Sequence, residues 1–195
     1  MDTFDFGSGP VPAYQHPTGG GWVADTATVA ASAYVGPGAR VYGDAQVSGR
    51  AMIYGSARVC GDAWVYGAAQ VCGDAWVYGG AQVCGAALIC GAARISSAAD
   101  ILTGYAGGYP WAAYRCSRGW RLRYGCEVHP PSEWRRLHVA LAVKHTGSTA
   151  HAEHTRAVEA LVRAHIDTCR SSVVQTPRGV TTGESVARVA YYSRT

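Results

Sequence analysis

The hexapeptide GDAWVY occupies residues 61–66 and returns unchanged at residues 73–78. Outward from these two copies, an aliphatic residue falls at every sixth position across residues 23–101, which makes fourteen positions without a slip. An alanine lies two positions before each aliphatic residue across residues 27–99, and a glycine lies two positions after each across residues 43–91. A period of six fits neither an α-helix nor a heptad coiled coil.

The six-residue period predicts a parallel β-helix, in which every hexapeptide makes one short strand and one corner. Side chains alternate between the two faces of a strand, so Ala63 and Val65 should face inward while Trp64 and Tyr66 face outward. The glycine that follows allows a corner because it has no β-carbon. One hexapeptide cannot bury its valine alone, so successive coils must stack on one another.

The 195 residues suffice for one repeat domain and one small domain. The formal charge is +4 overall, but residues 103–195 carry +7, whereas residues 22–102 carry −1 and residues 1–21 carry −2. We therefore expect an acidic partner to bind the C-terminal part. The chain has no transmembrane run, and its acidic start lacks the basic and apolar regions of a signal peptide, which predicts a cytoplasmic protein without membrane attachment.

The patterns divide the chain into four predicted segments. They are an N-terminal lead-in without regular structure at residues 1–21, the hexapeptide β-helix at residues 22–102, a small α+β domain at residues 103–170 and a tail at residues 171–195. The tail has no helical period, and its residues 186–192 are a candidate strand.

Within the α+β domain, a glycine-rich linker over residues 105–109 precedes two segments of alternating apolar and polar residues. This alternation predicts a β-hairpin with strands at residues 111–116 and 120–128. A helix is predicted at residues 133–145 behind an N-capping serine, and a second helix at residues 150–169.

The repeat resembles the hexapeptide-repeat proteins that form a left-handed β-helix. That resemblance implies triangular coils of three hexapeptides, so that each residue stacks on the one 18 positions later. The order of the parts is also similar to an uncharacterised group of phage and prophage proteins, over about residues 25–168. Besides the repeat, the residues that carry this second resemblance are Ala99-Asp100-Ile101, Tyr114-Arg115, Tyr124-Gly125-Cys126 and His151-Ala152-Glu153. The phage group brings no activity with it.

Many hexapeptide-repeat proteins are trimeric acyltransferases that use acetyl-CoA or acyl-CoA, and their general base is a histidine on or beside a coil. Another branch, the γ-type carbonic anhydrases, binds metal through coil histidines. This chain has no histidine between His16 and His129, so its coils lack such a base. We therefore predict a protein that is not an enzyme and has no cofactor, and keep a CoA-dependent acyltransferase as the alternative.

The candidate metal ligands are His151, His154 and His165. The first two are three residues apart on a predicted helix, but His165 lies about three turns further along and cannot converge with them. The seven cysteines include no Cys-x-x-Cys spacing. We predict reduced thiols and no metal site.

Arginines and aromatic residues together predict a binding surface for an anionic or acidic partner. Arg58, Trp76 and Arg94 are 18 residues apart and should stack as a ladder of guanidinium and indole groups. A second cluster on the predicted hairpin comprises Arg115, Arg121, Arg123 and Trp111. There an anion would relieve the repulsion between like charges on facing strands. The alternative is that the aromatic residues pack the two domains together and the arginines are solvated.

Another face of the predicted prism is apolar. Its stacked residues are Tyr34, Met52, Tyr54 and Leu88. A patch of this kind is rarely left exposed to water, so we expect another subunit or the C-terminal domain to cover it. A homo-oligomer, dimeric or trimeric, follows as the prediction.

The sequence thus predicts a mainly β protein, a left-handed parallel β-helix followed by a small α+β domain. The predicted function is that of a non-catalytic binding protein of phage or prophage type, whose partner is a host protein, a nucleotide or a nucleic acid. The specific hypothesis is interference with a host defence system by masking a host protein or sequestering a nucleotide. The alternatives are the acyltransferase and a purely structural solenoid.

Overall fold

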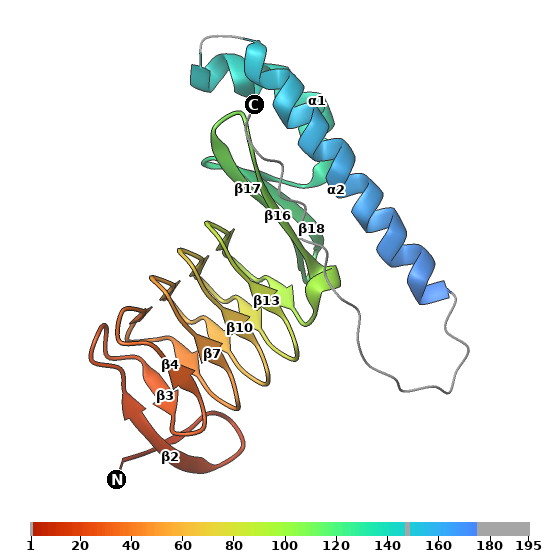
Figure 1. Cartoon of the computed structure of the whole chain (residues 1–195). Coiled ribbons are helices and arrows are strands. Elements are labelled where there is room, and N and C mark those ends of the chain that lie inside the picture. Colours follow the sequence, from red (N-terminus) through yellow and green to blue (C-terminus); the bar gives the residue numbers. More distant parts are fainter. Residues whose placement is uncertain (1, 147–148, 175–195) are drawn as a thin grey trace. The chain divides into compact units, whose positions relative to one another are not determined.

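The computed structural model describes residues 2–146 and 149–174 and divides into two compact units. The first, called here the solenoid unit, contains the chain up to Ile101 together with Tyr114–Arg118. The second, called the helical unit, contains Leu102–Ala113 and the described residues from Gly119 onward. Figure 1 shows the stacked coils of the solenoid unit and the sheet and helices that follow them in the chain.

The solenoid has three walls of short parallel strands, and each hexapeptide contributes one strand to one wall. The first wall contains β3 (Trp22–Ala24), β6 (Arg40–Val41), β9 (Arg58–Val59), β12 (Trp76–Val77) and β15 (Arg94–Ile95). The second wall contains β4 (Thr28–Val29), β7 (Gln46–Val47), β10 (Trp64–Val65) and β13 (Gln82–Val83). The third wall contains β5 (Tyr34–Val35), β8 (Met52–Ile53), β11 (Gln70–Val71) and β14 (Leu88–Ile89). The chain is therefore a β-solenoid of about four turns.

The register between coils follows the 18-residue spacing, as Val65 of β10 pairs with Val47 below it and Val83 above it. The inward positions are closed to solvent, since both Ala63 and Val65 are 0% exposed. This confirms the predicted core. Val29 is partly exposed because β4 is the first strand of its wall and has a neighbour on one side alone.

The corner glycines meet two separate requirements. Gly49 has a φ of +68°, a left-handed conformation that a residue with a side chain adopts at a cost. A β-carbon at Gly49 would also lie 2.7 Å from the carbonyl oxygen of Gly67 in the next coil. The absent side chain therefore serves both the turn and the stacking.

The N-terminal residues form a hairpin, where the sequence led us to expect no regular structure. Strand β1 (Thr3–Asp5) pairs with β2 (Pro10–Gln15), and β2 pairs antiparallel with β3, which extends the first wall beyond its parallel strands. That expectation was wrong because two phenylalanines anchor the segment. Phe4 stacks on Trp22 with ring centroids 4.7 Å apart, and Phe6 stacks on Tyr42 at 4.9 Å.

The repeat ends in a short 3-10 turn, η1 (Ala98–Asp100). The buried carboxylate of Asp100 accepts hydrogen bonds from the backbone nitrogen and the hydroxyl of Ser96, at 2.9 and 2.6 Å. Residues 114–118 then return to the solenoid, where Cys116 forms an antiparallel bridge with Ala93.

The helical unit contains an antiparallel sheet and two helices. The strands follow the order β16 (Ile101–Ala106), β17 (Tyr109–Cys116), β18 (Gly119–Tyr124) and β19 (Glu127–His129), and the helices are α1 (Pro131–Thr146) and α2 (Ala150–Val174). Both predicted helices are confirmed. The predicted hairpin is present as β17 and β18, but its predicted second strand at residues 120–128 was wrong, because a turn at residues 125–126 divides it into β18 and β19. The predicted linker at residues 105–109 is instead a tight turn between β16 and β17, made by Gly107 and Gly108 with φ of +55° and +83°.

A hydrophobic core joins this sheet to α2. Trp134 is 2% exposed and donates a hydrogen bond from Nε1 to the carbonyl oxygen of Leu122 at 2.7 Å, while Val158 and Val162 contribute from α2. Helix α2 continues to Val174, so the predicted tail begins as helix. The candidate strand at residues 186–192 lies outside the described residues. Neither described helix carries an apolar stretch long enough to cross a membrane.

Replacing Gly49 with alanine is expected to destabilise the fold more than replacing Gly85, which lies in the same corner column. Both glycines have similar φ values, +68° and +69°, so both substitutions should incur about 1–2 kcal/mol of left-handed strain. A β-carbon at Gly85 meets no atom within 4 Å, whereas at Gly49 it would overlap the next coil and add about 1–3 kcal/mol. Urea unfolding of both variants measures the difference. Equal losses would contradict the role given to the close stacking of coils.

Candidate functional site

The outer surface of the first wall carries a column of arginines and aromatic side chains. In the pairing register, Trp22 lies beside Arg40, Arg40 beside Arg58, Arg58 beside Trp76, and Trp76 beside Arg94. Each residue occupies the outward position before a buried valine or isoleucine. We call this column the arginine face.

The predicted ladder of Arg58, Trp76 and Arg94 is present. The guanidinium carbons of Arg58 and Arg94 lie 5.8 and 5.7 Å from the indole centroid of Trp76, within the range of a cation–π contact. Trp76 is held in place by a hydrogen bond from its Nε1 to the sulfur of Cys60 at 3.1 Å. Arg94 also donates to the backbone carbonyl oxygens of Asp74 and Ala93, both at 2.9 Å.

The arginine face continues into the N-terminal hairpin. The Arg40 guanidinium lies 5.1 Å from the centroid of the Phe4 ring, which stacks on Trp22. The six-residue period does not place Phe4 on this face, because Phe4 lies outside the repeat and reaches the wall through β1. A signal was present, since the chain has two phenylalanines and they are two residues apart, a spacing that places both on one side of an extended segment.

The guanidinium groups of the arginine face keep their charge uncompensated. Among residues 2–146 and 149–174, no carboxylate forms an ion pair with Arg40, Arg58 or Arg94. Arg40 has a small electrostatic effect on Asp5. The pKa of Asp5 is lowered mainly by backbone hydrogen bonds from Gly7 and Gly9 and only slightly by Arg40. The face is therefore a column of cations available to an anion.

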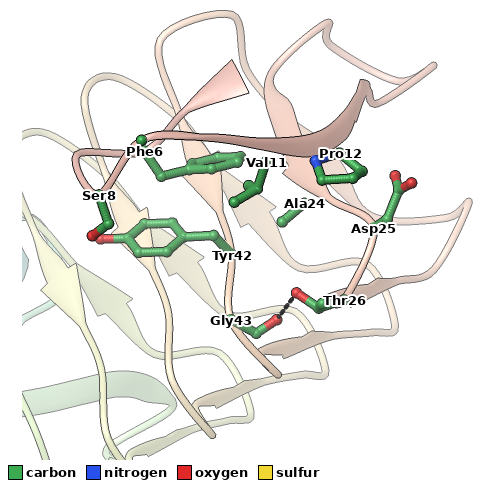
Figure 2. Close-up of a pocket in the computed structure, with 10 residues that line it drawn as sticks. Phe6, Ser8, Val11, Pro12, Ala24, Asp25, Thr26, Tyr42 and Gly43 are labelled. Atoms are coloured by element: carbon green, nitrogen blue, oxygen red, sulfur yellow. Dashed lines mark hydrogen bonds between the residues drawn. The ribbon is translucent and has the colours of Figure 1, made fainter. Parts of the chain in front are cut away.

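A pocket of about 350 Å³ lies between the N-terminal hairpin and the first coils. Figure 2 shows Phe6, Val11 and Pro12 from the hairpin side facing Tyr42 and Thr26 of the coils. The Thr26 hydroxyl donates to the carbonyl oxygen of Gly43 at 2.7 Å, which leaves the lining mostly apolar. Burial, with a hydrogen bond to Cys60 as the second cause, raises the pKa of Tyr42 to about 12, so its hydroxyl stays protonated at neutral pH.

The pocket adjoins the arginine face because Tyr42 directly follows β6, the strand that carries Arg40. Arg40 and Tyr42 are two residues apart and face outward from the same wall. An apolar pocket of this volume, next to guanidinium groups, is of the size that small ligands occupy.

The second predicted cluster is distributed over both units. Arg115 belongs to the solenoid unit, where its Nη1 lies 3.5 Å from Oδ1 of the buried Asp100. Arg121 and Arg123 belong to β18 of the helical unit and donate to the carbonyl oxygens of Trp120 and Gly125, at 3.1 and 2.7 Å.

Trp111 does not line a binding surface. It is 7% exposed and belongs to the core of the helical unit, where it packs with Leu122 and Trp134. Four consecutive residues of β17, from Trp111 to Tyr114, are buried, so both faces of the strand are covered there and the alternation does not separate a buried face from an exposed one.

Of the three α2 histidines that were considered as candidate metal ligands, His165 packs against other side chains. His165 makes an edge contact with Trp120 and lies 3.5 Å from the sulfur of Cys169. In the solenoid unit the one histidine of the sequence is His16, which is 2% exposed and bonded to the backbone of Thr18. A buried histidine of this kind cannot reach a substrate hydroxyl or amine.

The third wall carries the predicted apolar face. Tyr34, Met52, Gln70 and Leu88 follow one another in the register. The Tyr54 hydroxyl donates to the Gln70 side chain at 3.2 Å, which covers part of the column. Met52 remains 38% exposed.

The coils make the chain a β-solenoid repeat protein, and comparison with known proteins agrees. The family model described as the YdcK beta solenoid repeat matches residues 45–61 and 69–85, in the middle coils. No curated protein and no solved structure matches the chain. The similarity therefore concerns the repeat and brings no activity or partner.

Replacing both Met52 and Leu88 with arginine tests whether the apolar face is an interface. Both side chains point outward, so the fold should tolerate the change, while buried charges would disrupt a contact across this face. We expect light scattering to show a lower molecular mass for the double variant, with the parent forming a dimer or trimer. An unchanged mass together with unchanged protease resistance would show that the face is free.

Proposed function

We propose that this chain is a non-catalytic binding protein whose arginine face and adjoining pocket take up a nucleotide or a nucleic acid. The observation that carries the proposal is the sandwich of Trp76 between Arg58 and Arg94, with no carboxylate partner for either guanidinium in the part of the chain that the structure describes. Guanidinium groups bind the oxygens of phosphates and of carboxylates in a bidentate manner, and this supports an anionic ligand.

The arginine side chains of this face are already held in place, and this supports binding with little loss of conformational entropy. The Trp76 ring holds Arg58 and Arg94 from both sides, and the backbone carbonyl oxygens fix Arg94 further. Groups that are already ordered lose less freedom when a ligand arrives. Neighbouring strands of the wall are about 4.8 Å apart. Arg40, Arg58 and Arg94 therefore present a row of positive charges to successive phosphates.

The pocket supports a nucleotide over a phosphate ion alone. Its apolar lining and the stacked rings of Phe6 and Tyr42 suit the flat face of a base, while Arg40 lies two residues from Tyr42. Stacking of bases on aromatic side chains beside arginines is the general mode of sequence-tolerant nucleic-acid binding. We place the base in the pocket and the phosphates along Arg40, Arg58 and Arg94.

The resemblance of residues 25–168 to a phage and prophage group supports the finer proposal, which is interference with a host defence system. Sequestering a nucleotide is the form of interference that the arginine face and pocket favour. Masking a host protein is the second form, and an acidic protein surface would bind the same arginines. The two forms differ in whether a free nucleotide competes with the partner.

Glutamine substitutions separate the arginine face from general charge. Anisotropy of a fluorescently labelled single-stranded oligonucleotide should report binding that weakens as salt rises, because exposed charges are screened within about 8 Å at physiological ionic strength. The double change Arg58→Gln and Arg94→Gln should weaken binding roughly 10-fold or more, since each charge-assisted bond contributes about 1.5–3 kcal/mol. The matched control is Arg50→Gln, an exposed arginine outside the face.

The triple change Arg115→Gln, Arg121→Gln and Arg123→Gln tests the second cluster in the same assay. A loss confined to this triple variant would move the binding surface to the hairpin. Binding that is equal at low and high salt, with both sets of variants like the parent, would leave the solenoid as a purely structural element. Polyglutamate that binds while the oligonucleotide does not would favour the acidic protein partner.

The acyltransferase alternative has its own measurement. We expect thiol release from acetyl-CoA to stay at background across amines, sugars and antibiotics, because the solenoid unit offers no accessible histidine among its described residues. Turnover that disappears on changing His129, His138 or His151 would establish the enzyme instead. Those histidines lie outside the solenoid unit, so such a result would also relocate the site.

A further inference from the structure

A cluster of side chains that bind transition metals lies where the β18–β19 turn meets the end of α1. Cys126 lies in the turn, Glu127 begins β19, and His145 is the second-last residue of α1. The cysteine sulfur, a Glu127 carboxylate oxygen and a His145 ring nitrogen all lie within 4.8 Å of one another. These residues belong to the helical unit and take no part in the arginine face.

Glu127 is the centre of this cluster. One of its oxygens lies 2.6 Å from Nε2 of His145 and 3.0 Å from Nζ of Lys144, and the other lies 3.1 Å from Nε2 of His129. The carboxylate of Glu127 therefore has nitrogen atoms close to both of its oxygens, and it lies within reach of the two other possible ligand atoms.

His129 orients the carboxylate of Glu127. His129 bonds the second oxygen of Glu127 and places its other ring nitrogen 3.3 Å from the carboxylate of Glu133. Chains of carboxylate and imidazole groups that orient a ligand in this way are the usual surroundings of protein-bound zinc. Glu127 is 19% exposed and His129 is 25% exposed, so solvent reaches both only in part.

We propose that Cys126, Glu127 and His145 bind a zinc ion. A thiolate, an imidazole and a carboxylate together suit Zn²⁺, whereas Mg²⁺ and Ca²⁺ prefer sets of oxygen ligands. Zinc bonds of about 2.0–2.3 Å in a tetrahedron separate the ligand atoms by roughly 3.4–3.6 Å, which a small adjustment of the present cluster reaches. The ion would replace the hydrogen bond between His145 and Glu127.

The site has three protein ligands and leaves a fourth position for water or a partner's side chain. Cys126 is exposed and lies in a turn, so the open position faces solvent. Lys144 competes with the ion for the same oxygen of Glu127. Metal binding then ties the β18–β19 turn to α1 more firmly than the hydrogen bonds alone. The proposal is independent of the arginine face.

Cobalt(II) is the probe, because its complexes with a thiolate are coloured and zinc complexes are not. The full chain, produced without a polyhistidine tag and stripped with a chelator, should develop tetrahedral and sulfur-to-cobalt absorption bands at one ion per chain. Addition of Zn²⁺ should remove these bands and raise the midpoint of thermal unfolding. Bands without a sulfur contribution, or no uptake at all, would overturn the proposal.

Substitutions locate the ion. Cys126→Ser and His145→Asn should each abolish the cobalt bands, and His129→Gln should weaken zinc binding about 10–100-fold, as loss of an orienting partner does. Cys84→Ser is the matched control, since Cys84 lies in the solenoid unit and should leave the spectrum unchanged. Lys144→Gln should tighten binding because it removes the competing cation. Equal spectra for Cys126→Ser and Cys84→Ser would place any bound ion elsewhere and refute the site.

Discussion

The backbone hydrogen bonds between successive coils are the constraint on which the solenoid depends. Each strand of the solenoid has about two residues, so the backbone N–H and C=O groups of a coil find few hydrogen-bond partners within that coil. They pair with the backbone of the next coil instead. Gln46 donates to the carbonyl oxygen of Ala63 at 2.8 Å, and Ser48 donates to that of Val65 at 2.9 Å. These bonds require the coils to lie about 4.8 Å apart. Glycine at the corners allows that approach, and an alanine beside every valine keeps the interior narrow.

This register turns residues that are far apart in the sequence into neighbours on a wall. Because the inward positions are reserved for alanine and valine, the outward positions are free to vary without cost to the core. Arg58, Trp76 and Arg94 form one column for this reason, and Tyr34, Met52 and Leu88 form another. A shift of a single residue in one coil would turn its outward side chains inward. The outward columns are therefore as well defined as the core.

The sequence predicts those parts of the fold in which period decides position. The buried valines follow from the spacing, whereas the three columns and the cation–π ladder also need the coil of three hexapeptides that the resemblance implied. The left-handed sense of the coils stays a prediction from the same resemblance. The N-terminal hairpin has no period, and its place depends on the contacts of Phe4 and Phe6 with side chains of the wall. Trp111 shows a different limit: the alternation along β17 suggests one exposed face, but residues 111–114 are buried on both faces of the strand, and only tertiary packing decides that.

The ligands of the proposed zinc site could not be predicted from sequence spacing, for a geometric reason. Ligands on a single helix lie about one turn apart in the sequence, as His151 and His154 do. Cys126 and His145 are 19 residues apart and meet because α1 turns back along the hairpin that precedes it. From Pro131 to His145 the helix advances about 21 Å, enough to retrace β19 and reach the turn. The sequence pattern that could predict such a site is a cysteine in a tight turn and a glutamate directly after it. A short strand, a proline and a helix of about four turns with a histidine near its end then follow.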